Sequence, residues 1–185
     1  MTTMERIRPA AGEIRRGIQQ AARLALVAVL TGCGGDPGEH EYSARFALTF
    51  PDGWERRENY RDMPLVAVAS TEDPAEFPAN LNVRLVGNPG GVDLDGFYAE
   101  HFDENVARSV HEGFELIDVS DQQLGAHAAK RVVYTHHIPP DDLKSVAWLV
   151  IAGRRGYIIT GNAAAQQFDR YERVFDRIAA SFDPE

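Results

Sequence analysis

Hydrophobic residues recur at every second position in the segments that follow residue 40. Residues 46–50 alternate apolar and polar or small side chains, which predicts a strand with one buried face, and 51–53 (Pro-Asp-Gly) ends it with turn-forming residues. Residues 65–69 form a continuous apolar run, which is typical of a strand covered on both faces. Alternation returns over residues 79–86, so we expect three strands in this part of the chain.

The hydrophobic period then changes to three and four residues over positions 93–112. This spacing predicts one amphipathic helix, capped by Asp93 and ended near Gly113. A second helical stripe covers residues 168–182. Between the two helices, strand patterns occupy residues 114–119, 130–138, 143–151 and 157–161, and the glycines of 153–156 favour a tight hairpin between the last two.

The order of these elements is strands, helix, strands, helix. Short hairpins rather than crossover helices join most neighbouring strands. We therefore expect an α+β fold in which helices pack on a largely antiparallel sheet.

The N-terminal segment differs from the rest of the chain. Residues 24–30 are apolar but too few to span a bilayer, and five arginines precede them or lie at their start. Leu30, Thr31, Gly32 and Cys33 resemble the lipobox of bacterial lipoproteins, which implies that Cys33 is acylated and becomes the new N-terminus. The alternative is a buried amphipathic helix that is followed by an ordinary free cysteine.

The lipobox resemblance divides the chain into a signal peptide (1–32), a glycine-rich tether (33–40) and one domain (41–185). Arg15 and Arg16 resemble a twin-arginine export signal, and general secretion explains the same residues. Gly34 is not the aspartate associated with inner-membrane retention. We therefore expect a cell-envelope lipoprotein, in the outer membrane if the bacterium has two membranes.

Charge limits the classes of partner. The chain has a net charge of −9, and residues 1–32 contribute +3, so residues 33–185 carry −12. An acidic domain disfavours nucleic acid and is not drawn to anionic lipid headgroups, so membrane attachment must come from the acyl chains on Cys33. Cys33 is the single cysteine, so the domain gains no disulfide and must be stabilised by packing.

Three stretches resemble the PsbP/DcrB-like superfamily over residues 41–182: the turn 50–54 (Phe-Pro-Asp-Gly-Trp), the strand 130–134 and the end of the last helix at 178–182. The resemblance implies an α/β/α sandwich around an antiparallel sheet of about six or seven strands, with two main helices. Members include photosystem II extrinsic subunits, a Ran-binding import factor, chaperones of secretion-system effectors and bacterial lipoproteins. The resemblance thus implies a non-enzymatic binding or assembly role with a protein partner.

Catalytic and metal-binding motifs are lacking in the sequence. It contains no Gly-x-Ser-x-Gly elbow, no glycine-rich phosphate loop and no His-Glu-x-x-His helix, and we predict no catalytic residue and no cofactor. His136 and His137, near Asp141 and Asp142, are the best metal candidates. Adjacent strand residues point to opposite faces, so the two histidines cannot easily share one ion and no metal is expected.

Two further histidines and both tryptophans have structural explanations. His101 lies on the buried side of the first helix, and His111 near its C-terminus is explained by capping and the helix dipole. Trp148 alternates with valines and is expected in the core. Trp54 is either a plug at one end of the sandwich, which the resemblance favours, or an exposed recognition residue.

Two loops remain as candidate partner contacts. Arg154 and Arg155 form a rare basic spot at a hairpin tip, and Asp141 and Asp142 lie in the turn 139–142. The main hypothesis is a lipid-anchored binding or chaperone module. The alternative is a lipid-anchored hydrolase whose site is assembled from dispersed residues.

Overall fold

The computed structural model describes residues 40–42, 46–61, 63–71, 76–88, 90–103, 107–109 and 111–185. The predicted lipobox, Leu30, Thr31, Gly32 and Cys33, and the tether up to residue 39 lie outside these ranges. None of the helices in the described ranges is long and apolar enough to cross a membrane.

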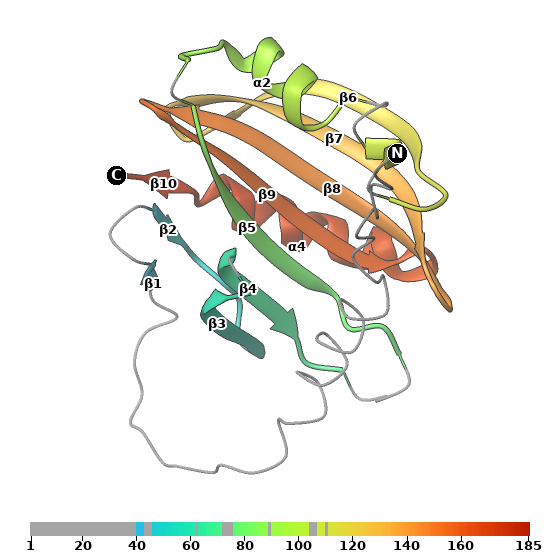
Figure 1. The fold of residues 1–185 in the computed structure, drawn as a ribbon. Coiled ribbons are helices and arrows are strands. Elements are labelled where there is room, and N and C mark those ends of the chain that lie inside the picture. Colours follow the sequence, from blue (N-terminus) through green and yellow to red (C-terminus); the bar gives the residue numbers. More distant parts are fainter. Residues whose placement is uncertain are drawn as a thin grey trace, which may run out of the picture. The chain divides into compact units, whose positions relative to one another are not determined.

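A seven-stranded sheet forms the centre of the domain (Figure 1). Its strands are β3 (Trp54–Tyr60), β4 (Met63–Ala69), β5 (Asn80–Gly87), β6 (Glu115–Leu124), β7 (His127–Ile138), β8 (Asp141–Ala152) and β9 (Arg155–Ala164). Their order across the sheet is β3-β4-β5-β9-β8-β7-β6, and every neighbouring pair is antiparallel. The predicted largely antiparallel sheet is confirmed.

A second, smaller sheet joins the two ends of the domain. It consists of β1 (His40–Tyr42), β2 (Phe46–Leu48) and β10 (Asp183–Pro184), with β2 in the middle. Two strands that are far apart in the sequence, β2 and β10, therefore lie side by side.

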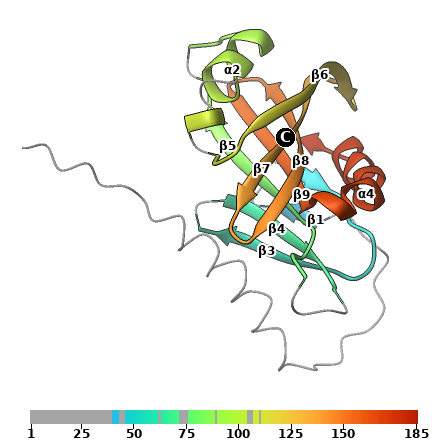
Figure 2. The same ribbon diagram turned by 90° about the vertical axis from the view of Figure 1, so that its right-hand side faces the viewer.

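Helices cover both faces of the seven-stranded sheet. The helix α2 (Leu94–His101) lies on one face; the short 3-10 turn η1 (Ala165–Gln167) and the helix α4 (Phe168–Ala180) lie on the other (Figures 1 and 2). Alternate residues of β8 enter the two cores: Val146 and Trp148 pack on the α4 side, and Ala147 and Leu149 on the α2 side. This arrangement is the predicted α/β/α sandwich.

Two glycines of β9 allow the helices to approach the sheet closely. A Cβ at Gly161 would lie 2.6 Å from ring atoms of Phe175 in α4, and one at Gly156 would lie 2.3 Å from Cζ of Phe97 in α2. Both phenylalanines are fully buried. The missing Cβ atoms thus make room for one aromatic ring on each face of the same strand.

The prediction of one helix over 93–112 is wrong. Asp93 does cap α2, with its carboxylate accepting the Gly96 N–H at 2.8 Å, but α2 ends at His101 and the chain is helical again at 107–109. Phe102 has a φ of −150° and packs edge-on against Tyr134, with ring centroids 5.2 Å apart. The break lets Phe102 bury its ring in the α2 core instead of continuing the helix.

The strand β3 was not predicted from the sequence. Its residues, Trp-Glu-Arg-Arg-Glu-Asn-Tyr, show no regular alternation because it is an edge strand and exposed on much of its length. Several predicted strands are longer than their apolar cores indicate: β6 runs to Leu124, β7 begins at His127 and β9 ends at Ala164. Backbone pairing in hairpins extends these strands beyond their hydrophobic residues.

Both tryptophans pack as predicted. Trp148 is completely buried. Trp54 is partly buried, with its ring centroid 5.9 Å from that of Phe50 and 6.2 Å from that of Phe175. Trp54 therefore closes one end of the α4 core, as the plug interpretation requires.

Candidate functional site

The predicted basic spot lies at the turn between β8 and β9. Arg154 is exposed, and its backbone carbonyl accepts the Asn88 N–H at 3.0 Å. Arg155 is the first residue of β9 and only half-exposed, and its guanidinium donates to the backbone carbonyl of Glu185 at 3.1 Å. Arg155 therefore holds the C-terminal residue, and a partner contact at this tip stays a prediction.

The two aspartates lie in a strand, not in the turn. Asp141 and Asp142 are the first residues of β8, because the chain turns at residues 139 and 140 alone. Asp142 Oδ1 lies 2.8 Å from His137 Nδ1, in an exposed pair at the start of the hairpin. His136 and His137 do point to opposite faces, and no group of three His, Cys, Asp or Glu residues that could hold a metal occurs in the described part of the chain.

A line of polar side chains crosses four strands on the α2 side of the sheet. We name it the polar chain; it comprises His136 on β7, Ser145 on β8, Asn162 on β9 and Asn80 on β5. His136 Nε2 lies 3.0 Å from Ser145 Oγ, and Ser145 Oγ donates to Asn162 Oδ1 at 2.8 Å. Asn162 Nδ2 donates to Asn80 Oδ1 at 3.0 Å, and Asn80 Nδ2 donates to the Pro78 carbonyl at 3.2 Å.

The Pro78 carbonyl sets the direction of these hydrogen bonds, because it can only accept. Each amide and hydroxyl along the polar chain then donates in the direction of Pro78. The Ser145 oxygen therefore accepts a hydrogen bond from His136 Nε2–H. His136 Nδ1 is left with a bare lone pair, and it is buried with no hydrogen-bond partner among the described residues. The polar chain thus fixes the tautomer of His136.

Burial keeps this histidine neutral. The pKa of His136 is lowered to about 4, mainly by burial and to a smaller extent by the neighbouring His111 and His137. Burial also lowers the pKa of His111, with a smaller contribution from Arg84, and it raises the pKa of Tyr134.

The sequence explains His111 by capping and the helix dipole, and the structure adds a packing role. Its ring packs on Tyr134 and His136, with centroids 5.5 and 4.8 Å apart. His101 is packed as predicted, with its ring centroid 4.7 Å from that of Phe97.

The pairing of Ser145 with His136 is not that of a nucleophile with its base. A serine nucleophile donates its proton to histidine, and a carboxylate orients the other ring nitrogen. Here Ser145 is fully buried and donates to Asn162, and none of the carboxylates that the structure describes contacts His136 Nδ1. The geometry fits a structural hydrogen-bond chain.

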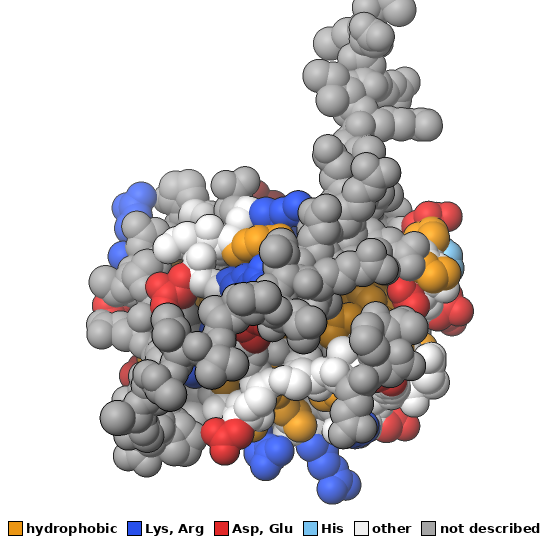
Figure 3. Space-filling model, turned by 90° about the horizontal axis from the view of Figure 1, so that it is seen from below, with side chains coloured by type: hydrophobic (Ala, Val, Ile, Leu, Met, Phe, Trp, Pro, Cys, Tyr) orange, Lys and Arg blue, Asp and Glu red, His pale blue; other side chains and the backbone are white. Residues whose placement is uncertain are grey.

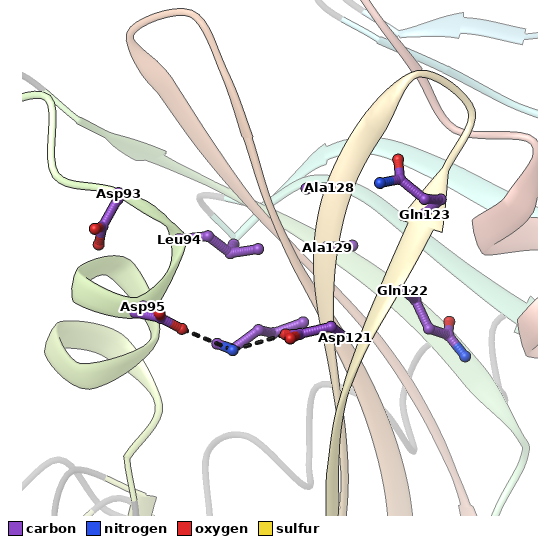
Figure 4. A pocket seen from close by; sticks show the side chains of 9 residues that line it. Asp93, Leu94, Asp95, Asp121, Gln122, Gln123, Ala128 and Ala129 are labelled. Carbon is purple, nitrogen blue, oxygen red and sulfur yellow. Dashed lines mark hydrogen bonds and ion pairs between the residues drawn. The ribbon is translucent and has the colours of Figure 1, made fainter.

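An open cleft of about 570 Å³ lies between the start of α2 and the β6–β7 hairpin (Figure 4). Lys130 Nζ bridges two carboxylates in it, Asp95 of α2 at 2.7 Å and Asp121 of β6 at 2.8 Å. These hydrogen bonds raise the pKa of Lys130. Gln123 and Leu94 also line the cleft, which is accessible and has three aspartates and one lysine among its lining residues.

Sequence reasoning did not identify the polar chain or the cleft. Ser145 and Asn162 stand in apolar stretches of β8 and β9, and this is a usable signal, since a buried polar residue needs a partner. Asn80 and Asn162 are 82 residues apart, so no local spacing links them. No pattern in the sequence marks Lys130 as a residue that bridges two carboxylates.

No protein-family model and no curated protein matches the sequence. Solved structures do match. Cyanobacterial PsbP (CyanoP) from Synechocystis has 17% sequence identity and a TM-score of 0.60, over 84% of this chain and 99% of that one. LpqN of Mycobacterium tuberculosis, described as involved in cell envelope biogenesis, has 16% identity and a TM-score of 0.58, over 75% and 82% of the two chains.

The Ran-binding protein Mog1p of Saccharomyces cerevisiae has 15% identity and a TM-score of 0.56, over 79% of this chain and 94% of that one. At these identities the matches describe a shared fold and not a shared activity. Together with the seven-stranded antiparallel sheet and its two helices, they identify the fold of this chain as that of the PsbP/DcrB-like family.

Proposed function

We propose that this chain is a cell-envelope binding or assembly module, tethered to a membrane by acyl chains on Cys33 and acting on a protein partner. The fold is shared with a Ran-binding protein and with an envelope-biogenesis protein, which supports a binding role. The lipobox-like residues 30–33 support the tether.

The observation that carries the proposal is how the domain uses its reactive side chains. His136, Ser145 and Asn162 bond to one another inside the sheet, where a substrate has no access to the hydroxyl. The accessible features are an acidic cleft, an edge strand and loops, which are surfaces that suit recognition. The geometry supports binding better than hydrolysis.

Lipidation is tested by labelling a culture with a fatty-acid analogue. We expect label on the wild-type protein in the membrane fraction and none on a Cys33→Ser variant. Label retained by the variant, or absent from the wild type, would contradict the tether. In a bacterium with two membranes, a density gradient should place the protein in the outer membrane, and an inner-membrane position would correct this assignment.

The export route has its own test. Arg15→Lys combined with Arg16→Lys should block export if the twin-arginine route is used. Unchanged export of the double variant assigns the chain to general secretion.

Partner binding is tested by crosslinking in intact cells followed by purification from membranes. Alanine at Arg154 and Arg155 should reduce recovery of the partner if the hairpin tip contributes, and alanine at Asp141 and Asp142 tests the start of β8. Esterase, peptidase or glycosidase activity of the purified protein that disappears in a Ser145→Ala variant that still folds would replace the binding proposal with the hydrolase.

A further inference from the structure

We propose that the outer edge of β6 binds an extended segment of a partner protein by strand addition, and that this segment carries basic residues beside an apolar one. This inference rests on the proposed binding function and names its surface and the chemistry of its partner.

The strand β6 is the last strand of the seven-stranded sheet, and β7 is its one pairing partner among the strands that the structure describes. Alternate residues of an antiparallel strand direct their N–H and C=O groups away from the neighbour. The β6–β7 turn has two residues, Gly125 with a φ of 58° and the residue after it, so Leu124 and His127 form its closing pair. Counting back from that pair, the backbone groups of Val119, Asp121 and Gln123 point outward.

Exposed hydrophobic side chains gather on this strand. Among the described residues, three large hydrophobic side chains are exposed: Val92, Ile117 at 50% and Val119 at 37%. Two of the three belong to β6, where a bulge at Ile117 interrupts the pairing with β7. An added strand would cover these side chains and supply partners for the outward backbone groups.

The charge around the edge determines which partner fits. Glu115, Asp118 and Asp121 of β6 are all exposed, and β6 contains no lysine or arginine. The nearest cation, Lys130, already lies between Asp121 and Asp95 (Figure 4). The edge therefore presents a negative strip, to which lysine or arginine side chains are complementary.

The opposite edge of the sheet is β3, and its charges differ from those of β6. β3 has seven residues, four of them charged, and Arg57 forms an ion pair with Glu55 at 2.7 Å. Figure 3 shows basic and acidic side chains mixed among hydrophobic ones on the face of the molecule seen from below. Charges of both signs on β3 disfavour an added segment of either charge, whereas the acidic charges of β6 disfavour only an acidic segment.

The register of an added strand follows from the pleat. Its residues opposite Val119 and Asp121 lie on the α2 side of the sheet, and its residue opposite Asp118 lies on the other side. An apolar residue opposite Val119, with basic residues opposite Asp118 and Asp121, satisfies all three positions. A second copy of β6 would bring acidic side chains opposite acidic ones, which disfavours a symmetric dimer through this edge.

The test uses the full chain, purified in detergent, and three ten-residue peptides. The lysine–valine peptide is built on the pattern Lys-Thr-Val-Lys, which places valine opposite Val119 and lysines opposite Asp121 and Asp118. The lysine–proline peptide has Pro-Pro in place of Thr-Val, and the glutamate–valine peptide has glutamate in place of both lysines. We expect the lysine–valine peptide to bind and to slow hydrogen exchange at Val119, Asp121 and Gln123. The other two should bind roughly tenfold more weakly or less, because one lacks strand-pairing N–H groups and the other has the wrong charge. Equal binding of the lysine–proline peptide would reduce the effect to charge attraction and overturn strand addition.

Two variants locate the peptide. Val119→Lys should weaken binding of the lysine–valine peptide roughly tenfold, since it removes an apolar contact and adds a repelling charge. Glu58→Gln on β3 changes the charge by the same amount on the opposite edge and should leave binding unchanged. Thermal unfolding shows that both variants fold, and full peptide binding by a folded Val119→Lys variant would overturn the assignment.

One other occupant is an outcome of the same experiment. Concentration-dependent dimers that Val119→Lys abolishes would make this edge a contact between copies and would overturn the proposal. The lysine–valine peptide could fail to bind while the protein is still labelled with the fatty-acid analogue and still crosslinks to a partner. That result would reject this surface alone and would leave the proposed function standing.

Discussion

The two faces of the central sheet are built differently. The α4 face carries the larger apolar core, covered by a helix of 13 residues, and the α2 face carries a smaller core, a helix of eight residues and the polar chain. Apolar burial on the α4 face is the main source of stability. The α2 face has less apolar burial and more side-chain hydrogen bonds, so we expect pH to affect the stability of the fold mainly through this face.

Removing one phenylalanine from each face should give the largest difference. Phe175→Ala leaves a cavity under α4, and we expect it to lower the free energy of unfolding by about 3–5 kcal/mol. Phe97→Ala should cost about 3 kcal/mol or less, because the short helix α2 can settle into the space. Urea unfolding measures both, and an equal or larger loss for Phe97→Ala would contradict the ranking of the two faces.

Acid should act on the α2 face. The pKa of His136 lies at about 4 in the folded protein and near 6.5 when the chain is unfolded, so the unfolded state takes up the proton first. The contribution of neutral His136 to the free energy of unfolding is therefore fully present above pH 6.5. It is lost as the pH falls to 4, and the loss is on the order of 3 kcal/mol.

The control for this effect is His136→Gln, which keeps a donor for Ser145 and cannot titrate. Its stability should fall less steeply between pH 6.5 and 4 in urea unfolding at fixed pH values. The same slope in both proteins would assign the acid effect to the carboxylates instead.

Replacing Gly161 or Gly156 with alanine compares the two faces of the sheet in a second way. Gly161→Ala places a methyl group 2.6 Å from ring atoms close to the Phe175 backbone, and we expect a loss of about 1–3 kcal/mol. Gly156→Ala meets Cζ, the far end of the Phe97 ring, which can move with α2, so its loss should be smaller. Thermal unfolding of both variants checks the order, and Phe175→Leu should partly rescue Gly161→Ala.

The surface ion pairs should show the smallest difference. Asp95 and Asp169 each lie in the first turn of a helix, and each faces a lysine of the sheet, at 2.7 Å from Lys130 and 3.7 Å from Lys144. Asp95→Asn should cost about 0.5 kcal/mol and Asp169→Asn close to nothing, because exposed pairs contribute little. The Asp95 effect should disappear in 1 M salt, and persistence there would indicate a contact other than the ion pair.

How far the sequence predicts this molecule depends on the range of the interactions. The last helix and the buried strands were predicted because a regular apolar stripe on α4 and the apolar run of β8 are local signals. β3 was missed because a charged edge strand buries too little to show alternation. The helix break at Phe102 depends on Tyr134, a residue far along the chain, and local periodicity does not contain that contact.

The same reasoning explains why the candidate site was found only in part. Cys33 and its neighbours form a contiguous pattern, so their resemblance to a lipobox is visible in the sequence alone, and lipidation stays a prediction. The polar chain joins four strands, and the cleft joins α2 to a hairpin, so each exists only after the sheet has formed. Arg155 looked like an exposed basic residue, but it donates to the backbone of Glu185, 30 residues further along the chain, and no local spacing indicates that contact.

The position of β9 has a consequence for how the chain folds as it is synthesised. β9 lies between β5 and β8, so it is the strand that joins β3-β4-β5 to β8-β7-β6. It runs from Arg155 to Ala164 and follows the other six strands in the sequence. Because synthesis runs from the N-terminus, β6, β7 and β8 can pair as hairpins early, but the two halves of the sheet stay separate until β9 has emerged. A nascent chain of this protein therefore cannot complete its central sheet before residues 155–164 have left the ribosome, however early its hairpins form.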